Sequence, residues 1–289
     1  MIGAQRLTKK FGKKQVLQEL SFSFGEGIYG LVGPNGAGKT TFLRCLIGVY
    51  PPTAGRVLYN GAPVGRKNDV TRHLGYLPQK FGIYPELTVW EAMEYLCVIK
   101  GVPKAARKKQ IEQKLEQVNL LARRDSRVGA LSGGMVRRLG LAGALVGDSP
   151  LLILDEPTAG LDPEERMRFK NIIRSLGGER TVILSTHIME DVEALCQQIV
   201  IVNQGRVIAA GSPKEIASLA DGMTYEIPEG ETVPEKAVVS KITEHDGQRF
   251  CRVVTTAPCS GTPVLPTVED GYIGAVEGIV HVEKTGLLL

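Results

Sequence analysis

The stretch GPNGAGKT, residues 33–40, follows the apolar segment GIYGLVG (27–33), which has the composition of a buried β-strand. It fits the pattern G-x-x-x-x-G-K-[ST], in which glycines let backbone N–H groups turn inward around an anion. A helix that begins after the loop adds its positive N-terminus. We therefore predict a phosphate-binding loop, with Lys39 reaching the β- and γ-phosphates of a nucleotide and the Thr40 hydroxyl as a Mg²⁺ ligand.

Two fully apolar segments, LLIL (151–154) and TVIL (181–184), flank an amphipathic stretch, a pattern that predicts a parallel sheet buried on both faces. Asp155 and Glu156 follow the first segment, at the strand end where such sheets bind ligands. We expect Asp155 to hold Mg²⁺ through its water shell and Glu156 to be the general base. His187 ends the next strand and can donate to a γ-phosphate, although a histidine there, taken alone, is more often structural.

Turn and cap signals divide the rest of the chain. The stretch from Leu87 to about Val146 is helical in pattern, with a first helix capped by Thr88, and residues 198–212 predict a β-hairpin. Beyond residue 221 the composition changes. Two alternating segments flank Asp246-Gly247, which predicts a second hairpin, and residues 266–276 predict a helix capped by Thr267.

Composition is that of a folded globular protein: 289 residues, 43% hydrophobic and 23% charged. The charge is uneven, because residues 221–289 carry 5 Lys/Arg against 11 Asp/Glu, a net charge of −6 that leaves +10 for residues 1–220. We place a domain boundary near residue 220. A basic main body fits a protein that binds polyphosphate or lies near anionic lipid, and it fits nucleic acid as well.

Membrane-spanning and disulfide-rich classes are not expected. The longest uncharged apolar stretches fall short of the ~20 residues that span a bilayer, and residues 1–11 lack a signal-peptide core, which predicts a cytosolic protein. The five cysteines show no C-x-x-C spacing and the four histidines no metal-ligand pairing, so buried reduced thiols are expected and a zinc site is not.

Six elements, in this order, resemble the ATP-binding subunits of ABC (ATP-binding cassette) transporters: GPNGAGKTT, Gln79 in GYLPQ, LSGGM, LLILDEP, AGLD and LSTH. The resemblance covers residues 1–220. It implies an α/β P-loop NTPase with a mainly parallel core sheet, an antiparallel β subdomain and a helical subdomain at about 81–145. A small acidic α+β appendage, residues 221–289, would follow.

The resemblance also assigns the site, with ATP and Mg²⁺ as cofactors. Phe11 would stack on adenine, unless it is a core or turn phenylalanine, and Gln79 would sense Mg²⁺ and the attacking water. The expected catalytic residues are Glu156, His187 and Gln79, and the expected metal residues are Thr40, Gln79 and Asp155. The expected nucleotide contacts are Phe11, Gly33, Asn35, Gly36, Gly38, Lys39, Thr40, Thr41, Ser132, Gly133, Gly134 and Asp162.

In this family the LSGG signature closes over ATP held by a second subunit, so Ser132 and the Gly134 N–H would donate to a phosphate across the dimer. Asp162 would also contact the opposite subunit. The chain has one set of motifs, so the second set comes from another chain, identical or different. Met135 stands where glutamine is usual, and we interpret Arg137 and Arg138 as a solvated helix face. The last predicted helix, PTVEDGYIGAV (266–276), resembles a segment that ends many bacterial exporter ATPases of this family, and in it Gly271 stands where a branched apolar residue is usual.

The function implied is the ATPase motor of a bacterial exporter, bound through separate transmembrane permease subunits to the cytoplasmic face of the membrane. Residues 81–145 would carry the docking surface, with Phe81, Tyr84 and Trp90 as contacts or as core residues. The alternatives are a soluble ABC ATPase acting on the ribosome or nucleic acid, and an importer ATPase. We expect no nucleic-acid partner, because neither a second cassette nor a long coiled-coil insertion is present.

Overall fold

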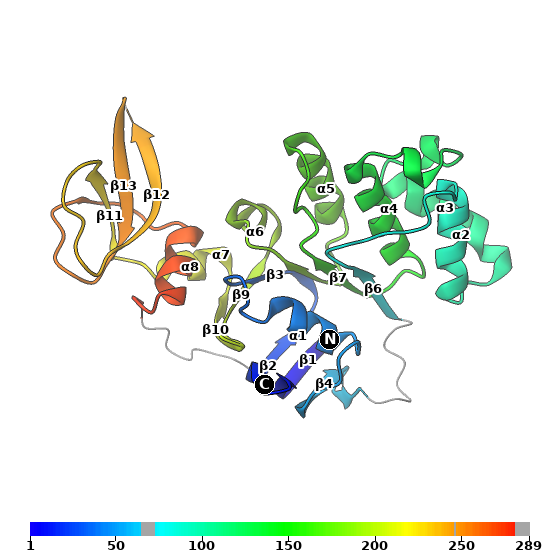
Figure 1. Ribbon diagram of the computed structural model, residues 1–289, viewed down its shortest axis with the longest axis horizontal. Coiled ribbons are helices and arrows are strands. Elements are labelled where there is room, and N and C mark those ends of the chain that lie inside the picture. The colour runs from blue at the N-terminus through cyan, green and yellow to red at the C-terminus, as the bar shows by residue number, and fades with distance from the viewer. Residues whose placement is uncertain (65–72, 246, 281–289) are drawn as a thin grey trace.

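The computed structural model describes residues 1–64, 73–245 and 247–280 (Figure 1). Three β-sheets and eight α-helices make up this part of the chain. The helices are α1 (Lys39–Leu46), α2 (Val89–Ile99), α3 (Lys104–Gln117), α4 (Gly133–Leu145), α5 (Pro163–Ser175), α6 (Met189–Leu195), α7 (Pro213–Ser218) and α8 (Val268–Val276).

The central sheet has six strands in the order β10-β9-β3-β8-β7-β6. They are β3 (Gly27–Val32), β6 (Leu74–Leu77), β7 (Leu151–Asp155), β8 (Thr181–Ser185), β9 (Gln198–Asn203) and β10 (Arg206–Gly211). All neighbours are parallel except β9 and β10, which form the predicted hairpin. Every residue of β7 and β8 is buried, so the prediction of a parallel sheet covered on both faces is confirmed.

A second, antiparallel sheet has the order β2-β1-β4-β5, and α1 lies between it and the central sheet. Its strands are β1 (Ile2–Phe11), β2 (Lys14–Phe24), β4 (Ala54–Tyr59) and β5 (Ala62–Pro63). Phe42 and Leu46 of α1 pack with Phe24 of β2 and Ile153 of the central sheet in one apolar cluster. This cluster holds the helix that follows the phosphate-binding loop between two sheets.

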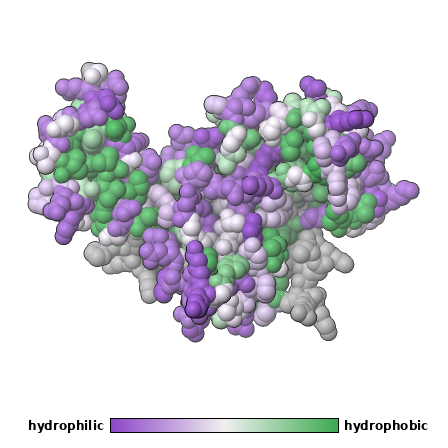
Figure 2. Space-filling view, viewed as in Figure 1, coloured by the Kyte–Doolittle hydropathy of each residue, from purple (hydrophilic) through white to green (hydrophobic). Residues whose placement is uncertain are grey.

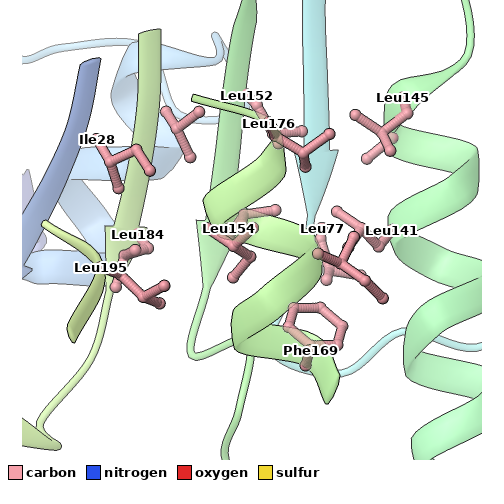
Figure 3. Packing of buried hydrophobic residues seen from close by; sticks show 14 of the residues in the cluster. Ile28, Leu77, Leu141, Leu145, Leu152, Leu154, Phe169, Leu176, Leu184 and Leu195 are labelled. Atoms are coloured by element: carbon pink, nitrogen blue, oxygen red, sulfur yellow. The ribbon is translucent and has the colours of Figure 1, made fainter. Parts of the chain in front are cut away.

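The predicted helical region packs against the opposite face of the central sheet. Leu141 of α4 lies beside Leu77 of β6, close to Leu154 of β7 and Phe169 of α5, and Leu145 lies one turn further along α4 in the same apolar cluster (Figure 3). The Thr88 hydroxyl accepts a hydrogen bond from the Glu91 N–H, and Glu91 reaches back to the Thr88 N–H, which confirms the capping box of α2. The leucine packing described above holds α4 against β6 and β7, whose ends carry the predicted site.

A third sheet, in the order β12-β13-β11-β14, forms the appendage together with α8. Its strands are β11 (Thr224–Pro228), β12 (Val238–His245), β13 (Gln248–Val254) and β14 (Thr262–Pro263). The predicted β12–β13 hairpin is confirmed, although Asp246 of its turn lies outside the described residues. Figure 2 shows apolar side chains on the surface of this part. Ile242 and Leu265 are large apolar residues of the appendage that are exposed.

Helix α8 joins the appendage to the main body. The buried Asp270 carboxylate accepts hydrogen bonds from Arg252 Nε at 2.9 Å and Ser240 Oγ at 2.6 Å, and it also caps the helix with Thr267 as predicted. The other end of α8 reaches the β9–β10 turn, where Asn203 Nδ2 donates to the Val276 carbonyl at 3.1 Å. The helix is therefore bonded to both units.

Gly271 lies at the point where α8 crosses α7. A Cβ at this position would lie 1.8 Å from the Ile216 carbonyl oxygen, which explains why the usual branched residue is absent. We expect Gly271→Ala to lower the free energy of unfolding by about 1–3 kcal/mol, because helix backbones must separate. Thermal unfolding measures this. Gly274→Ala is the matched control, since its Cβ would meet side-chain methyl groups of Val280, at 2.9 Å, and Val254, at 3.4 Å, rather than a backbone atom, and an equal loss in both variants would contradict the expectation.

Other expectations concern cysteines, metals and membrane segments. Cys45, Cys97 and Cys196 are buried free thiols, as predicted, whereas Cys251 and Cys259 are only partly buried. Burial raises the pKa of the Cys45 thiol to about 11. Within the described ranges no group of His, Cys, Asp or Glu side chains has the arrangement of a metal site, and no helix has the length and apolarity to cross a bilayer.

Candidate functional site

A cavity of about 690 Å³ lies over the start of α1 and the ends of β6 and β7. Predicted site residues that line it are Phe11, Asn35, Gly36, Gly38, Lys39, Thr40, Thr41, Gln79 and Glu156. The remaining wall comes from Ala37 of the loop, from the start of β2 and from Gln204 in the β9–β10 turn, none of which the sequence singled out. The structure therefore brings most of the predicted residues into one pocket.

The loop before α1 needs glycine at two positions for different reasons. A Cβ on Gly33 would lie 2.0 Å from the Val202 carbonyl oxygen, so the loop could not pack on β9. Gly38 has a φ of 107°, in a region that side chains disfavour, and it precedes the first turn of α1. The loop consequently leads into the N-terminus of α1 at the cavity wall, where the helix end is positive.

Lys39 is buried in this loop, with 7% of its surface exposed. Its Nζ donates to the carbonyl oxygens of Gly33, at 2.6 Å, and Pro34, at 3.2 Å. Burial lowers the pKa of Lys39 from its ordinary value, while the carboxylates of Glu156 and Asp155 raise it. The loop thus holds the ammonium group in place at the cavity wall.

Asp155 lies at the end of β7 and is fully buried. Its Oδ1 accepts hydrogen bonds from Ser185 Oγ at 2.6 Å and from Thr40 Oγ1 at 3.2 Å. Its Oδ2 is buried without a hydrogen-bond partner among the described residues, a costly state for a carboxylate oxygen. Carboxylate and hydroxyl oxygens are ligands that Mg²⁺ prefers, so the residues fit the predicted ion.

Glu156 adopts a left-handed backbone conformation, with a φ of 49°, which turns the chain sharply after the strand. Its N–H donates to the carbonyl and the hydroxyl of Ser185, each at 3.1 Å. Its Oε2 lies 3.0 Å from His187 Nδ1, so the predicted pair of side chains meets. Ser185 contacts both acidic residues but was not among the site residues expected from the sequence. The feature that could have indicated it is a hydroxyl residue at the end of an apolar strand, two positions before His187.

Phe11 forms the far wall of the cavity and is 43% exposed. The Tyr50 ring packs against it edge-on at a centroid distance of 5.2 Å, and Lys9 Nζ lies 4.9 Å from its centroid. Phe11 is therefore a supported surface ring at the end of β1, so the alternative of a core phenylalanine is wrong, whereas a turn phenylalanine remains the alternative to an adenine contact.

The signature residues and Asp162 lie outside this cavity. Ser132 caps α4, its Oγ accepting from the Met135 N–H at 3.2 Å, and Asp162 caps α5 in the same way. A Cβ on Gly134 would meet the Glu165 carboxylate at 2.6 Å. A Cβ on Gly133, by contrast, would have no described atom within 4 Å, apart from its chain neighbours and its own helix backbone. Packing against Glu165 explains why position 134 is glycine. No such packing requires glycine at position 133.

The interpretation of Arg137 and Arg138 as a solvated helix face is wrong, because they are only 8% and 3% exposed. Arg138 donates to both oxygens of Glu165, at 3.0 and 3.2 Å, and to two carbonyls at the end of α3. Arg137 donates to backbone carbonyls beside the cavity. The helix face is polar in sequence, yet its charges are satisfied inside the protein.

A glycine loop that leads from a parallel strand into a helix, with paired acidic residues at the end of β7, defines a P-loop nucleotide-hydrolysing protein. A family model described as ABC transporter matches residues 17–159. The Nod factor export ATP-binding protein I of Paraburkholderia xenovorans is 39% identical over 261 residues, which is 88% of this chain and 86% of that protein. The chain belongs to the ABC transporter family of ATP-binding subunits.

Two further likenesses agree with this assignment. The linearmycin resistance ATP-binding protein LnrL of Bacillus subtilis is 36% identical over 227 residues, 78% of this chain and 73% of that protein. A solved structure of an ATP-binding subunit of an ABC transporter superposes with a TM-score of 0.66 at 28% identity, covering 75% of this chain and 91% of that one. The protein is accordingly an ATP-binding cassette ATPase that uses ATP with Mg²⁺.

Proposed function

We propose that this ATPase is the motor subunit of an exporter, bound at the cytoplasmic face of the membrane through separate permease subunits. The relatives named for Nod factor export and linearmycin resistance support this direction of transport. The observation that carries the proposal is the cavity in which Lys39, Thr40 and Glu156 meet, with Asp155 beneath them. A role on the ribosome or nucleic acid is not favoured, since these relatives are transporter subunits.

The chemistry follows from this arrangement. Lys39 and the N–H groups of the loop bind the β- and γ-phosphates of ATP, and Phe11 stacks on the adenine. Mg²⁺, held by Thr40 and Asp155, supplies positive charge that offsets the phosphate oxygens. Glu156 takes the proton of the attacking water, and His187, hydrogen-bonded to it, keeps its carboxylate oriented and leaves Nε2 for the γ-phosphate.

A second cassette supplies the other half of the site. Ser132, Gly133 and Gly134 lie at the N-terminus of α4, away from the cavity of their own chain. The open space over Gly133 supports close approach by a phosphate bound in the partner subunit. Asp162, exposed at the start of α5, is proposed to contact the same partner.

The two signature glycines are expected to serve different purposes: Gly133 leaves room for a phosphate to approach, and Gly134 allows packing against Glu165. We expect Gly133→Val to leave thermal stability nearly unchanged but to reduce ATP-dependent dimer formation and turnover by about tenfold or more, because the side chain occupies the phosphate's approach. Gly134→Ala should instead lower thermal stability, since its Cβ meets Glu165. Melting curves and steady-state ATPase assays distinguish the two, and wild-type turnover in Gly133→Val would argue against a trans phosphate contact.

The helical region 81–145 is the proposed docking surface for the permease. Tyr84 is 60% exposed, and its ring meets that of Tyr95 at a centroid distance of 6.1 Å. Phe81 instead lies against Gly140, and Trp90 packs partly onto the core. Of the three aromatic contacts expected from the sequence, Tyr84 is the exposed one.

The proposed domain division places residues 1–220 in the cassette and 221–289 in an accessory unit. The separate sheet of the appendage and its acidic charge support a distinct unit. The hydrogen bond between Val276 of α8 and Asn203 lies next to Gln204 of the cavity wall. This contact favours a structural role for the appendage, in which it stabilises that wall of the ATP cavity.

The proposed function is tested with the purified chain and with membranes of its source. We expect ATP hydrolysis that requires Mg²⁺ and stops with a chelator, and co-purification in detergent of a polytopic membrane protein that raises this turnover. Tyr84→Ala should weaken the co-purification while leaving basal hydrolysis unchanged. Stimulation by ribosomes or nucleic acid, with no membrane partner, would contradict the proposal.

A further inference from the structure

Arg137 lies in the second turn of α4, below the cavity, and its guanidinium is buried. Nε donates to the Pro157 carbonyl at 3.0 Å, and Nη2 donates to the carbonyls of Asp155, at 3.0 Å, and Glu156, at 2.6 Å. Nη1 donates to the carbonyls of Pro78 and Gln79, each at 2.7 Å. A guanidinium has five N–H donors, so all of them are used on backbone oxygens.

These five oxygens come from two segments that are far apart in the chain. One is the end of β7 with the turn after it, residues 155–157, which carries the proposed general base and Mg²⁺ ligand. The other is the segment after β6, residues 78–79, which carries Gln79 at the cavity wall. The strands β6 and β7 pair through residues 74–77 and 151–154, and the ladder therefore stops before either segment begins. Arg137 continues the connection beyond the end of the sheet.

The bonding pattern differs from that of an ordinary buried ion pair. Burial lowers the pKa of Arg137, and the nearby carboxylates of Asp155 and Glu156 oppose that effect. No carboxylate accepts a hydrogen bond from Arg137 among the described residues, so the acidic side chains stay available for the cavity. Arg138, its neighbour, bonds to Glu165 and to the end of α3 instead.

We propose that Arg137 is a positioning residue that fixes the Gln79 segment to the turn of Asp155 and Glu156. This inference rests on the proposed function, because it concerns how those residues keep their relative places during hydrolysis. The left-handed backbone at Glu156 needs surrounding contacts to hold it, and two of the five bonds go to Glu156 and the residue after it. Arg137 also attaches both segments to α4, whose first residues are the signature.

Loss of Arg137 has a specific expected effect. Without it the Glu156 turn and the Gln79 segment move independently, and the base loses its alignment with the attacked phosphate. Small misplacements of this kind lower kcat by about 10- to 100-fold. Among the described residues Arg137 makes its hydrogen bonds to residues 78–79 and 155–157 and not to the phosphate-binding loop or Phe11, so the KM for ATP is expected to stay close to that of the wild type.

The test compares Arg137→Gln and Arg137→Lys with the matched control Arg138→Gln. All three change a buried arginine of the same helix, and melting temperature, binding of a fluorescent ATP analogue, KM and kcat are measured for each. Both Arg137 variants should keep nucleotide affinity and lose kcat by about tenfold or more. Arg138→Gln should lose thermal stability with less than about a twofold change in kcat at a temperature where it stays folded.

Arg137→Ala supplies a second readout, since it leaves a space lined by five carbonyl oxygens. Added guanidinium, below denaturing concentration, should restore part of its turnover, whereas urea at the same concentration should not. Equal kcat losses in Arg137→Gln and Arg138→Gln at equal loss of stability, or no rescue by guanidinium, would overturn the positioning role. Wild-type protein without Mg²⁺-dependent hydrolysis would overturn the proposed function itself, and the two failures are therefore distinct.

Discussion

Glu156→Gln is expected to slow ATP hydrolysis by about 10²-fold or more while leaving ATP bound. Glutamine keeps the shape of the side chain and its contact with His187, but it cannot take a proton from water. The proposed Mg²⁺ ligands are not altered, because the Asp155 carboxylate is held separately by Ser185 and Thr40. A phosphate-release assay under saturating ATP measures the loss, and turnover near that of the wild type would exclude Glu156 as the base.

Trapped ATP should also change the oligomeric state. Because ATP contacts both cassettes in the proposed dimer, it shifts the population toward the dimer when it is not hydrolysed. Size-exclusion chromatography of Glu156→Gln should show this shift with ATP and not with ADP. Adding Ser132→Arg should abolish it, since a long side chain would block the approach of the α4 N-terminus to the opposite phosphate. A dimer that forms with ATP but ignores Ser132→Arg would count against the trans signature.

Lys39→Ala is expected to lower turnover by at least about 10²-fold and to weaken ATP binding, because a fixed cation beside the phosphates is lost. The residue is already held by Gly33 and Pro34, so the positive charge requires little reorganisation before it acts. Lys14→Ala is the control, because Lys14 also lines the cavity but is exposed. Isothermal titration and ATPase assays measure both effects; unchanged turnover in Lys39→Ala would refute its phosphate role.

The core of the fold was predictable because local patterns carry it. Continuous apolar segments mark β7 and β8, and cap residues mark the starts of α2 and α8. The phosphate loop and the acidic pair were predictable for a related reason, since each is a short contiguous motif whose neighbouring strand is evident. Such features depend on residues a few positions apart, which a single sequence displays directly.

The missed features depend on partners distant in the chain. Arg137 and Arg138 follow the helical period as charged residues, and nothing local indicates carbonyl acceptors 18–59 positions away. The role of Ser185 depends on β8 pairing with β7, and that of Gly271 on the crossing of α7 and α8. Only the folded chain brings these groups together, so the burial of polar side chains was the least predictable property.

The acceptors of Arg137 are all main-chain oxygens, which every amino acid possesses. Substitutions at residues 78–79 and 155–157 that keep the backbone path therefore leave its hydrogen bonds intact, whereas position 137 requires a planar group with five donors. The side chains at these positions can therefore be substituted one at a time while the hydrogen bonds of Arg137 still hold the two backbone segments together. A Glu156→Gln variant is accordingly expected to keep the backbone geometry of the site, which separates the contribution of this side chain from that of the fold.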